Sequence, residues 1–228
     1  MKRETYFILL FLLIIVSCKQ NDPEPDLDSK SSIIYQDSLS VDKKTWISDS
    51  TNYHVRKFYQ GHYSIREDSI NTGGFSLAPY GTINFPYSVQ VDGVIQLDDP
   101  SKTGYIGIVF NHTDNTHYSI FEIDNNGSYF IFTYSNGSTT NIAPITQCPS
   151  FKTGNGAKNT LKLSQNSNKI QLRINNVVSG TFPVTMPSGN MQAGVFVGTL
   201  NVKVPSNVET LYYSPTTGLF NNFILTQN

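Results

Sequence analysis

The chain has 228 residues, enough for one all-β domain of roughly 195 residues once a leader and a linker are set aside. Charged residues make up 14% and aromatic residues 12% of the chain, and the formal net charge is -1. This composition is typical of extracellular β proteins, and it excludes a chain that is disordered throughout and the basic excess expected of a nucleic-acid-binding protein.

The N-terminal residues have the order of a secretory signal. Lys2 and Arg3 are positively charged, residues 6–16 are an unbroken apolar run, and the small residue Ser17 precedes Cys18. The run is much shorter than the ~20 apolar residues of a membrane-spanning helix. We therefore predict a signal peptide over residues 1–17.

The residues Ile15-Val16-Ser17-Cys18 resemble the lipobox of bacterial lipoproteins. The resemblance implies that Cys18 receives a diacylglyceryl group, becomes the mature N-terminus and anchors the protein to a lipid bilayer through acyl chains such as palmitate. An ordinary signal peptide with an incidental cysteine is the alternative. If Cys18 is lipidated, only Cys148 remains, so no internal disulfide is expected and Cys148 is predicted to be a buried or loop thiol.

Residues 18–32 are rich in proline, serine and acidic residues, lack apolar periodicity and are typical of a solvated tether. Their acidic positions Asp22, Glu24, Asp26 and Asp28 resemble the export signal of Bacteroidetes-type lipoproteins, which implies display on the outer face of the outer membrane. A charged spacer on a periplasm-facing lipoprotein is the alternative.

From residue 33 onward the pattern predicts short strands separated by turns, with no amphipathic helix. We expect a strand over 104–110, a polar loop over 111–116, and a hairpin of strands 117–124 and 128–134 around Asn125-Asn126-Gly127.

Further strands are expected after the Asn136-Gly137 turn. Residues 159–163 and 169–175 flank a second hairpin turn, and 192–199 and 218–227 form the last strands. The total of about ten to fourteen strands suits two packed antiparallel sheets in one domain over residues 33–228.

The order of several motifs resembles concanavalin A-like, laminin-G-like jelly-roll domains. The residues that carry it are 105–110, 118–123 and 126–129, followed by 152–161, 170–176, 191–196 and 219–225. The resemblance covers 46–225 and implies a two-sheet antiparallel jelly-roll sandwich. Such domains are mostly recognition or adhesion modules, and related folds include glycoside hydrolases and 3-keto-disaccharide hydrolase-like proteins. Asn176 and Asn221 replace the usual glycine and aspartate of the pattern.

Glu122 and Asp124 invite comparison with the E-x-D-x-x-E motif of laminarinase-like glycoside hydrolases. Retaining hydrolysis requires two carboxyl groups about 5 to 5.5 Å apart. The third acidic position is Gly127, so we interpret Glu122 and Asp124 as strand-end and turn residues and predict no catalytic residue.

No metal or cofactor is predicted. The four histidines, His54, His62, His112 and His117, lack zinc-site spacing and are expected to be solvent-facing loop residues. The loop acids Asp98, Asp99 and Asp114 are expected to be ordinary turn residues, with Ca²⁺ ligation as the alternative that their oxygens allow.

Aromatic residues are the remaining clue, because sugar-binding jelly rolls stack aromatic rings on pyranose faces. The chain has abundant tyrosines, which include Tyr105, Tyr118, Tyr129, Tyr134, Tyr212 and Tyr213. We take Tyr105, Tyr118, Glu122, Tyr129 and Arg173 as the candidate ligand-binding residues. Tyrosines in strands are commonly half-buried core residues, and Trp46, the only tryptophan, is expected in the core or at a sandwich edge.

The sequence therefore predicts a membrane-anchored lipoprotein whose non-catalytic jelly-roll domain binds a glycan or another extracellular macromolecule. A glycoside-active enzyme on the same fold and a structural envelope protein are the alternatives. No nucleic-acid partner is expected.

Overall fold

A computed structural model describes residues 27, 31–69, 72–199 and 214–227 of the chain. Within these residues the regular structure is entirely β, with fifteen strands, one more than the predicted range. No described helix is long and apolar enough to cross a bilayer. Cys18 and the predicted signal peptide over residues 1–17 lie outside the described residues, as do Tyr212 and Tyr213.

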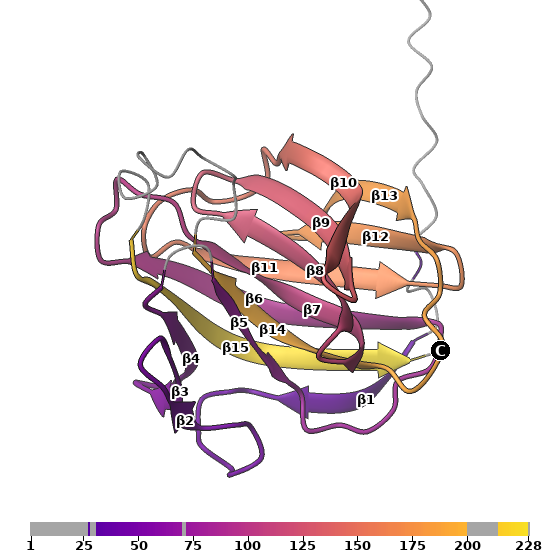
Figure 1. The fold of residues 1–228 in the computed structure, drawn as a ribbon, viewed down its shortest axis with the longest axis horizontal. Helices are drawn as coiled ribbons and strands as arrows, with labels where there is room; N and C mark the ends of the chain where they lie inside the picture. The colour runs from indigo at the N-terminus through magenta and orange to yellow at the C-terminus, as the bar shows by residue number, and fades with distance from the viewer. Residues whose placement is uncertain (1–26, 28–30, 70–71, 200–213, 228) are drawn as a thin grey trace, which may run out of the picture.

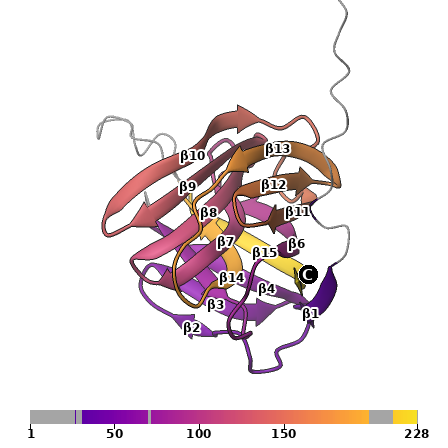
Figure 2. The ribbon, with the colours of Figure 1, turned by 90° about the vertical axis from the view of Figure 1, so that its right-hand side faces the viewer.

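The strands form two antiparallel sheets that pack face to face (Figures 1 and 2). The nine-stranded sheet has the order β13 (Val177–Pro183), β12 (Lys169–Ile174), β11 (Lys158–Gln165), β6 (Tyr87–Leu97), β15 (Thr216–Gln227), β4 (His62–Glu67), β3 (His54–Tyr59) and β2 (Asp49–Ser50), with β1 (Ser32–Asp37) also paired to β15. The six-stranded sheet has the order β10 (Ser138–Gln147), β9 (Ser128–Ser135), β8 (His117–Asp124), β7 (Tyr105–Asp114), β14 (Gln192–Gly198) and β5 (Gly73–Leu77). The predicted two-sheet sandwich is confirmed.

The predicted hairpins are confirmed, because β8 pairs antiparallel with β9 and β11 pairs antiparallel with β12. Two further tight turns use residues that tolerate positive φ values. Asn136 and Gly137 both have positive φ values, 49° and 84°, between β9 and β10. Asn175 and Asn176 do the same between β12 and β13, at 52° and 68°. Asn176 can therefore stand where the family pattern has glycine, because asparagine tolerates the left-handed region.

Residues of alternating strand positions fill the space between the sheets. Ile170, Leu172 and Ile174 of β12 are fully buried, while Arg173 between them is only half-buried. Trp46 is 3% exposed, and its ring lies 5.2 Å from those of both Tyr63 and Phe223, so the predicted core position of the tryptophan is confirmed.

Cys148 is buried, as predicted, and its sulfur lies 3.1 Å from Ser150 Oγ and 3.4 Å from Ser179 Oγ. Among the described residues it is the free cysteine of the domain and takes no part in the site described below.

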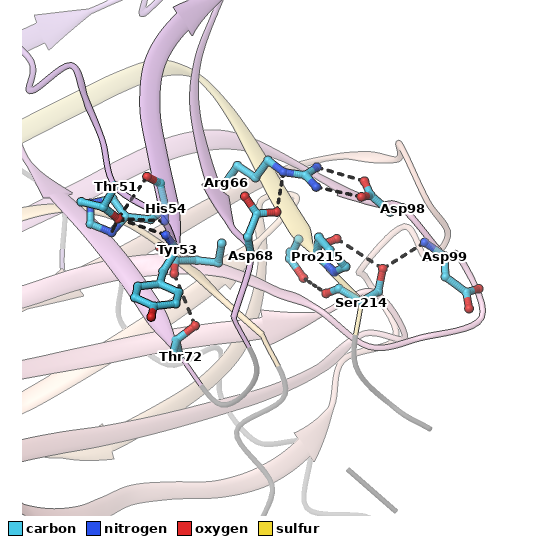
Figure 3. Close-up of polar contacts among 12 residues, drawn as sticks. Thr51, Tyr53, His54, Arg66, Asp68, Thr72, Asp98, Asp99, Ser214 and Pro215 are labelled. Atoms are coloured by element: carbon cyan, nitrogen blue, oxygen red, sulfur yellow. Dashed lines mark hydrogen bonds and ion pairs between the residues drawn. The ribbon is translucent and has the colours of Figure 1, made fainter. Parts of the chain in front are cut away.

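An ionic network holds the loop after β6 to the end of β4. The Arg66 guanidinium donates to both carboxylate oxygens of Asp98, at 3.0 and 2.8 Å, and to Asp68 at 2.7 Å (Figure 3). Asp99 beside it accepts from the backbone and hydroxyl of Ser101, at 3.0 and 2.7 Å. Both predicted turn acids are therefore engaged by local donors, and Arg66 lowers the pKa of Asp98.

Candidate functional site

The outer face of the six-stranded sheet carries a second apolar layer, separate from the core. Strand alternation sends Ile106, Ile108 and Phe121 into the sandwich and leaves their neighbours on the outside. The outer cluster consists of the buried residues Tyr105, Ile120 and Phe196 with the half-buried rings Phe75, Tyr118 and Phe132 packed on them. This outer face is therefore a candidate binding surface.

Strand β9 provides three aromatic side chains in alternate positions on this face. Phe130, Phe132 and Tyr134 are all half-buried. The Phe130 and Phe132 ring centroids lie 5.4 Å apart, and Tyr134 stacks on Tyr118 of β8 with centroids 5.0 Å apart and an interplanar angle of 23°. These three side chains are called the β9 ladder below.

A bulge in β7 shapes one end of the face. The register between β7 and β8 shifts between Phe110 and Asp114, and Asn111 has a φ of 52°. The Asn111 amide oxygen accepts a hydrogen bond from Tyr87 at 2.9 Å, which fixes the bulge to the core. The predicted loop over 111–116 is thus wrong, because β7 continues through the bulge to Asp114.

The bulge also places His112 on the outer face. Its ring stacks on Tyr118 at 6.2 Å and meets Phe75 edge-on at 5.3 Å, and the residue is 6% exposed. Burial lowers the pKa of His112, so the imidazole is held neutral at pH 7. The expectation that the histidines lie in solvent-facing loops is wrong, because His54, His62, His112 and His117 all lie on strands and His112 is buried.

A cavity of about 470 Å³ lies beside this bulge where β7 turns into β8. Its walls come from β7, β8, β9 and the segment between β13 and β14, and they are rich in hydroxyl groups. The lining residues are Asn111, Thr113, Asp114, His117, Tyr118, Ser119, Thr133, Tyr134, Ser135, Thr185, Met186, Pro187 and Ser188. Ser119, Thr133 and Ser135 alternate with Tyr118 and Tyr134, so these hydroxyl groups lie on the inner side of the sheet, opposite to the stacked tyrosine rings of the outer face.

An aspartate and a histidine, Asp114 and His117, line this cavity and contact each other. His117 Nδ1 lies 3.0 Å from both carboxylate oxygens of Asp114. The hydroxyl and backbone of Thr116 donate to the same carboxylate at 2.6 and 2.7 Å, and together with His117 they lower the pKa of Asp114 to about 2. The predicted turn role of Asp114 is confirmed, and the carboxylate stays ionised at neutral pH.

A smaller and more apolar pocket, about 190 Å³, lies further along β8 and β9. It is lined by Tyr105, Glu122, Asp124, Ser128, Tyr129, Phe130 and Ile145. Asp124 accepts from the backbone N–H groups of Asn126 and Ser128, both at 2.8 Å, so it anchors the β8–β9 turn as predicted. Burial nevertheless raises the pKa of Asp124. Glu122 is 2% exposed.

The structure brings together only part of the predicted ligand-binding set. Tyr105, Tyr118 and Glu122 lie on the outer face of the six-stranded sheet. Tyr129 borders the smaller pocket with Tyr105 and Glu122, but its ring packs in the core and its hydroxyl donates to the Ser179 carbonyl oxygen at 2.9 Å. Arg173 lies on β12 of the other sheet, so it cannot act in the same site.

The sequence reasoning missed Phe75, Phe130 and Phe132, because it considered tyrosines rather than the alternation of all aromatic residues. The signal was present in Ser128-Tyr-Phe-Ile-Phe-Thr-Tyr134, where one alternating set is aromatic on the outer face. No sequence pattern marked residues 185–188 as part of the cavity, because only the fold brings this segment from the end of β13 to the cavity wall.

No group of three or more histidine, cysteine or acidic side chains that could hold a metal ion is found among the described residues.

No family model matches the chain, and no curated protein matches it at significance. Solved structures do match over most of its length. The carbohydrate recognition domain of Emp47p aligns with a TM-score of 0.58 at 13% identity, covering 88% of this chain and 98% of that one. A carbohydrate-binding module from Bacillus subtilis aligns with a TM-score of 0.55 at 15% identity, covering 79% and 94%.

The catalytic domain of an endo-1,3-beta-glucanase (laminarinase) from Thermotoga petrophila also aligns, with a TM-score of 0.55 at 4% identity, covering 87% of this chain and 98% of that one. At these identities the likeness shows the fold alone. The chain is an antiparallel jelly-roll sandwich of the type found in lectins and carbohydrate-binding modules, and binding proteins and enzymes share it.

Proposed function

We propose that the protein is a non-catalytic glycan-binding protein whose ligand lies on the outer face of the six-stranded sheet. The observation that carries the proposal is the layer of half-buried aromatic rings on this face, where Tyr134 stacks on Tyr118 beside Phe132. Such rings cover the apolar face of a pyranose, and the tyrosine hydroxyls pair with sugar hydroxyls. The fold shared with carbohydrate-binding modules supports this reading.

Tyr134→Ala is expected to weaken glycan binding about tenfold, because stacking by one half-buried ring contributes roughly 0.5–1.5 kcal/mol beyond its area. The test is a glycan array followed by titration calorimetry on the full chain. Tyr59→Ala is the matched control, since Tyr59 is 50% exposed on the other sheet and should leave binding unchanged. Equal loss in both variants, or no glycan bound by the unaltered chain, would refute the proposal.

A glycoside-active enzyme is the second candidate, because Glu122 and Asp124 line one apolar pocket at alternate positions of β8. The hydrogen bonds that hold Asp124 in the turn give this carboxylate a structural role, which favours a binding protein over an enzyme. Release of reducing sugar from a β-1,3-glucan by the full chain, abolished by Glu122→Gln, would establish the enzyme.

We further propose that Cys18 is lipidated and that the domain is displayed on the outer face of the outer membrane. The support is the lipobox-like residues before Cys18 and the acidic stretch after it. Labelled palmitate should enter the unaltered protein and be absent from Cys18→Ala, whereas an unlabelled protein would contradict the anchor. Protease treatment of whole cells should cleave the domain, and protection would place it in the periplasm.

A further inference from the structure

We propose that the ligand is a neutral, extended glycan chain that runs along the outer face of β9, from Tyr134 to the pocket at Phe130. This inference rests on the proposed function and adds the charge, length and direction of the ligand. Two features of the six-stranded sheet carry it: the spacing of the β9 ladder and the absence of basic residues from the strands.

The ladder leads to the smaller pocket on this face. Phe130 lines that pocket, and Phe132 and Tyr134 follow it at alternate positions of the same strand. Since a strand rises about 3.4 Å per residue, Phe130 and Tyr134 are about 14 Å apart along β9. One pyranose ring covers about one aromatic ring, so only a chain of several sugars can contact the whole ladder.

The neighbouring side chains set the direction. In the rows across the sheet, Phe130 lies opposite Glu122, Phe132 opposite Ile120, and Tyr134 opposite Tyr118. Glu122 and Ile120 are 2% and 3% exposed, so the rings available to a ligand follow β9 rather than cross the sheet at its middle. On the far side of Phe132 the partner is the exposed, polar Asn141 of β10.

The charges of the two sheets differ. The six strands of this sheet contain no lysine or arginine. In the nine-stranded sheet the strands carry Arg56, Lys57, Arg66, Lys158, Lys162, Lys169 and Arg173.

The acidic side chains that line the cavity and the pocket are Asp114, Glu122 and Asp124. A uronate, sulfate or sialate group would therefore face carboxyl groups with no strand cation of the same sheet to pair with, and its lost hydration would not be recovered. A neutral sugar meets no such penalty.

The test is titration calorimetry of the full chain with neutral gluco-, manno- and galacto-oligosaccharides from monosaccharide to hexasaccharide, and with a galacturonate hexasaccharide. For the series that binds, affinity should rise about tenfold or more from disaccharide to tetrasaccharide and then level off, as further rings are covered. The galacturonate chain should bind at least about tenfold more weakly than the neutral hexasaccharide.

Phe130→Ala should remove most of the gain with chain length and leave the disaccharide affinity unchanged, while Tyr59→Ala should change neither. Phe130→Leu, which keeps an apolar side chain in the sheet, should give the same result if Phe130→Ala is poorly folded. A monosaccharide that binds as tightly as the hexasaccharide, or a galacturonate chain that binds as tightly as the neutral one, would overturn this inference and leave the proposed function intact. Binding to none of these probes would overturn both.

Discussion

Gly107→Ala is expected to destabilise the protein by about 3 kcal/mol or more, because β7 and β8 approach too closely at this position for a side chain. A Cβ atom at Gly107 would lie 2.0 Å from the carbonyl oxygen of Phe121 and 2.9 Å from its carbon, both backbone atoms that cannot rotate away. The position is buried and pairs with Glu122 in the middle of the six-stranded sheet. The strands would have to separate under the proposed binding face.

Gly81→Ala is the matched control for this prediction. Gly81 is exposed, and a Cβ atom there would meet no heavy atom within 4 Å. Urea unfolding of both variants and the unaltered chain measures the difference, and Gly81→Ala should stay within about 0.5 kcal/mol of the original. Equal unfolding midpoints for Gly107→Ala and Gly81→Ala would show that β7 and β8 are spaced differently from the structure.

Glu67→Gln is expected to remove a loss of stability that the unaltered protein suffers as the pH rises. Glu67 is the last residue of β4 and is 3% exposed. Gly74 lies against its Oε1, and the Thr72 hydroxyl donates weakly to its Oε2 at 3.4 Å. Burial raises the pKa of Glu67 from 4.5 to about 7, with Thr72 and Arg56 opposing the shift.

The sign follows from proton binding. Between pH 4.5 and 7 the folded chain retains the Glu67 proton that the unfolded chain has released, so stability falls with rising pH across this window and is lowest above it. The full shift corresponds to about 3 kcal/mol, and partial solvation of the carboxyl reduces the expected effect to about 2 kcal/mol.

Urea unfolding at pH 4.5 and pH 8 measures the effect. Relative to the unaltered chain, Glu67→Gln should gain about 2 kcal/mol of unfolding free energy between the two pH values, because the amide does not ionise. Asp98→Asn is a useful comparison. Arg66 lowers the pKa of Asp98, so this carboxylate stabilises the folded chain, and that stabilisation is lost as the pH falls into the acidic range. Parallel pH profiles for the unaltered chain and Glu67→Gln would contradict a buried, protonated Glu67.

The sequence was enough to predict the all-β class, the hairpins and the core faces. The alternation in β12 and the turn residues Asn136-Gly137 are local features, and such features specify the same local structure in any fold. The extension of β7 through its bulge to Asp114 was not predictable, because Asn111, Thr113 and Asp114 are typical loop residues. Long-range contacts hold them on the strand: the hydrogen bond from Tyr87 and the pairing of His112 with Gln192.

The candidate site divides in the same way. Composition indicated that sugar-stacking aromatic residues were available, and the sequence predicted Cys18 as the anchor. Which aromatic residues share one surface depended on the direction of each strand face and on sheet order, and these are decided by long-range pairing. That pairing sends Tyr129 into the core, leaves Phe130, Phe132 and Tyr134 outside, and separates Arg173 from them on the other sheet.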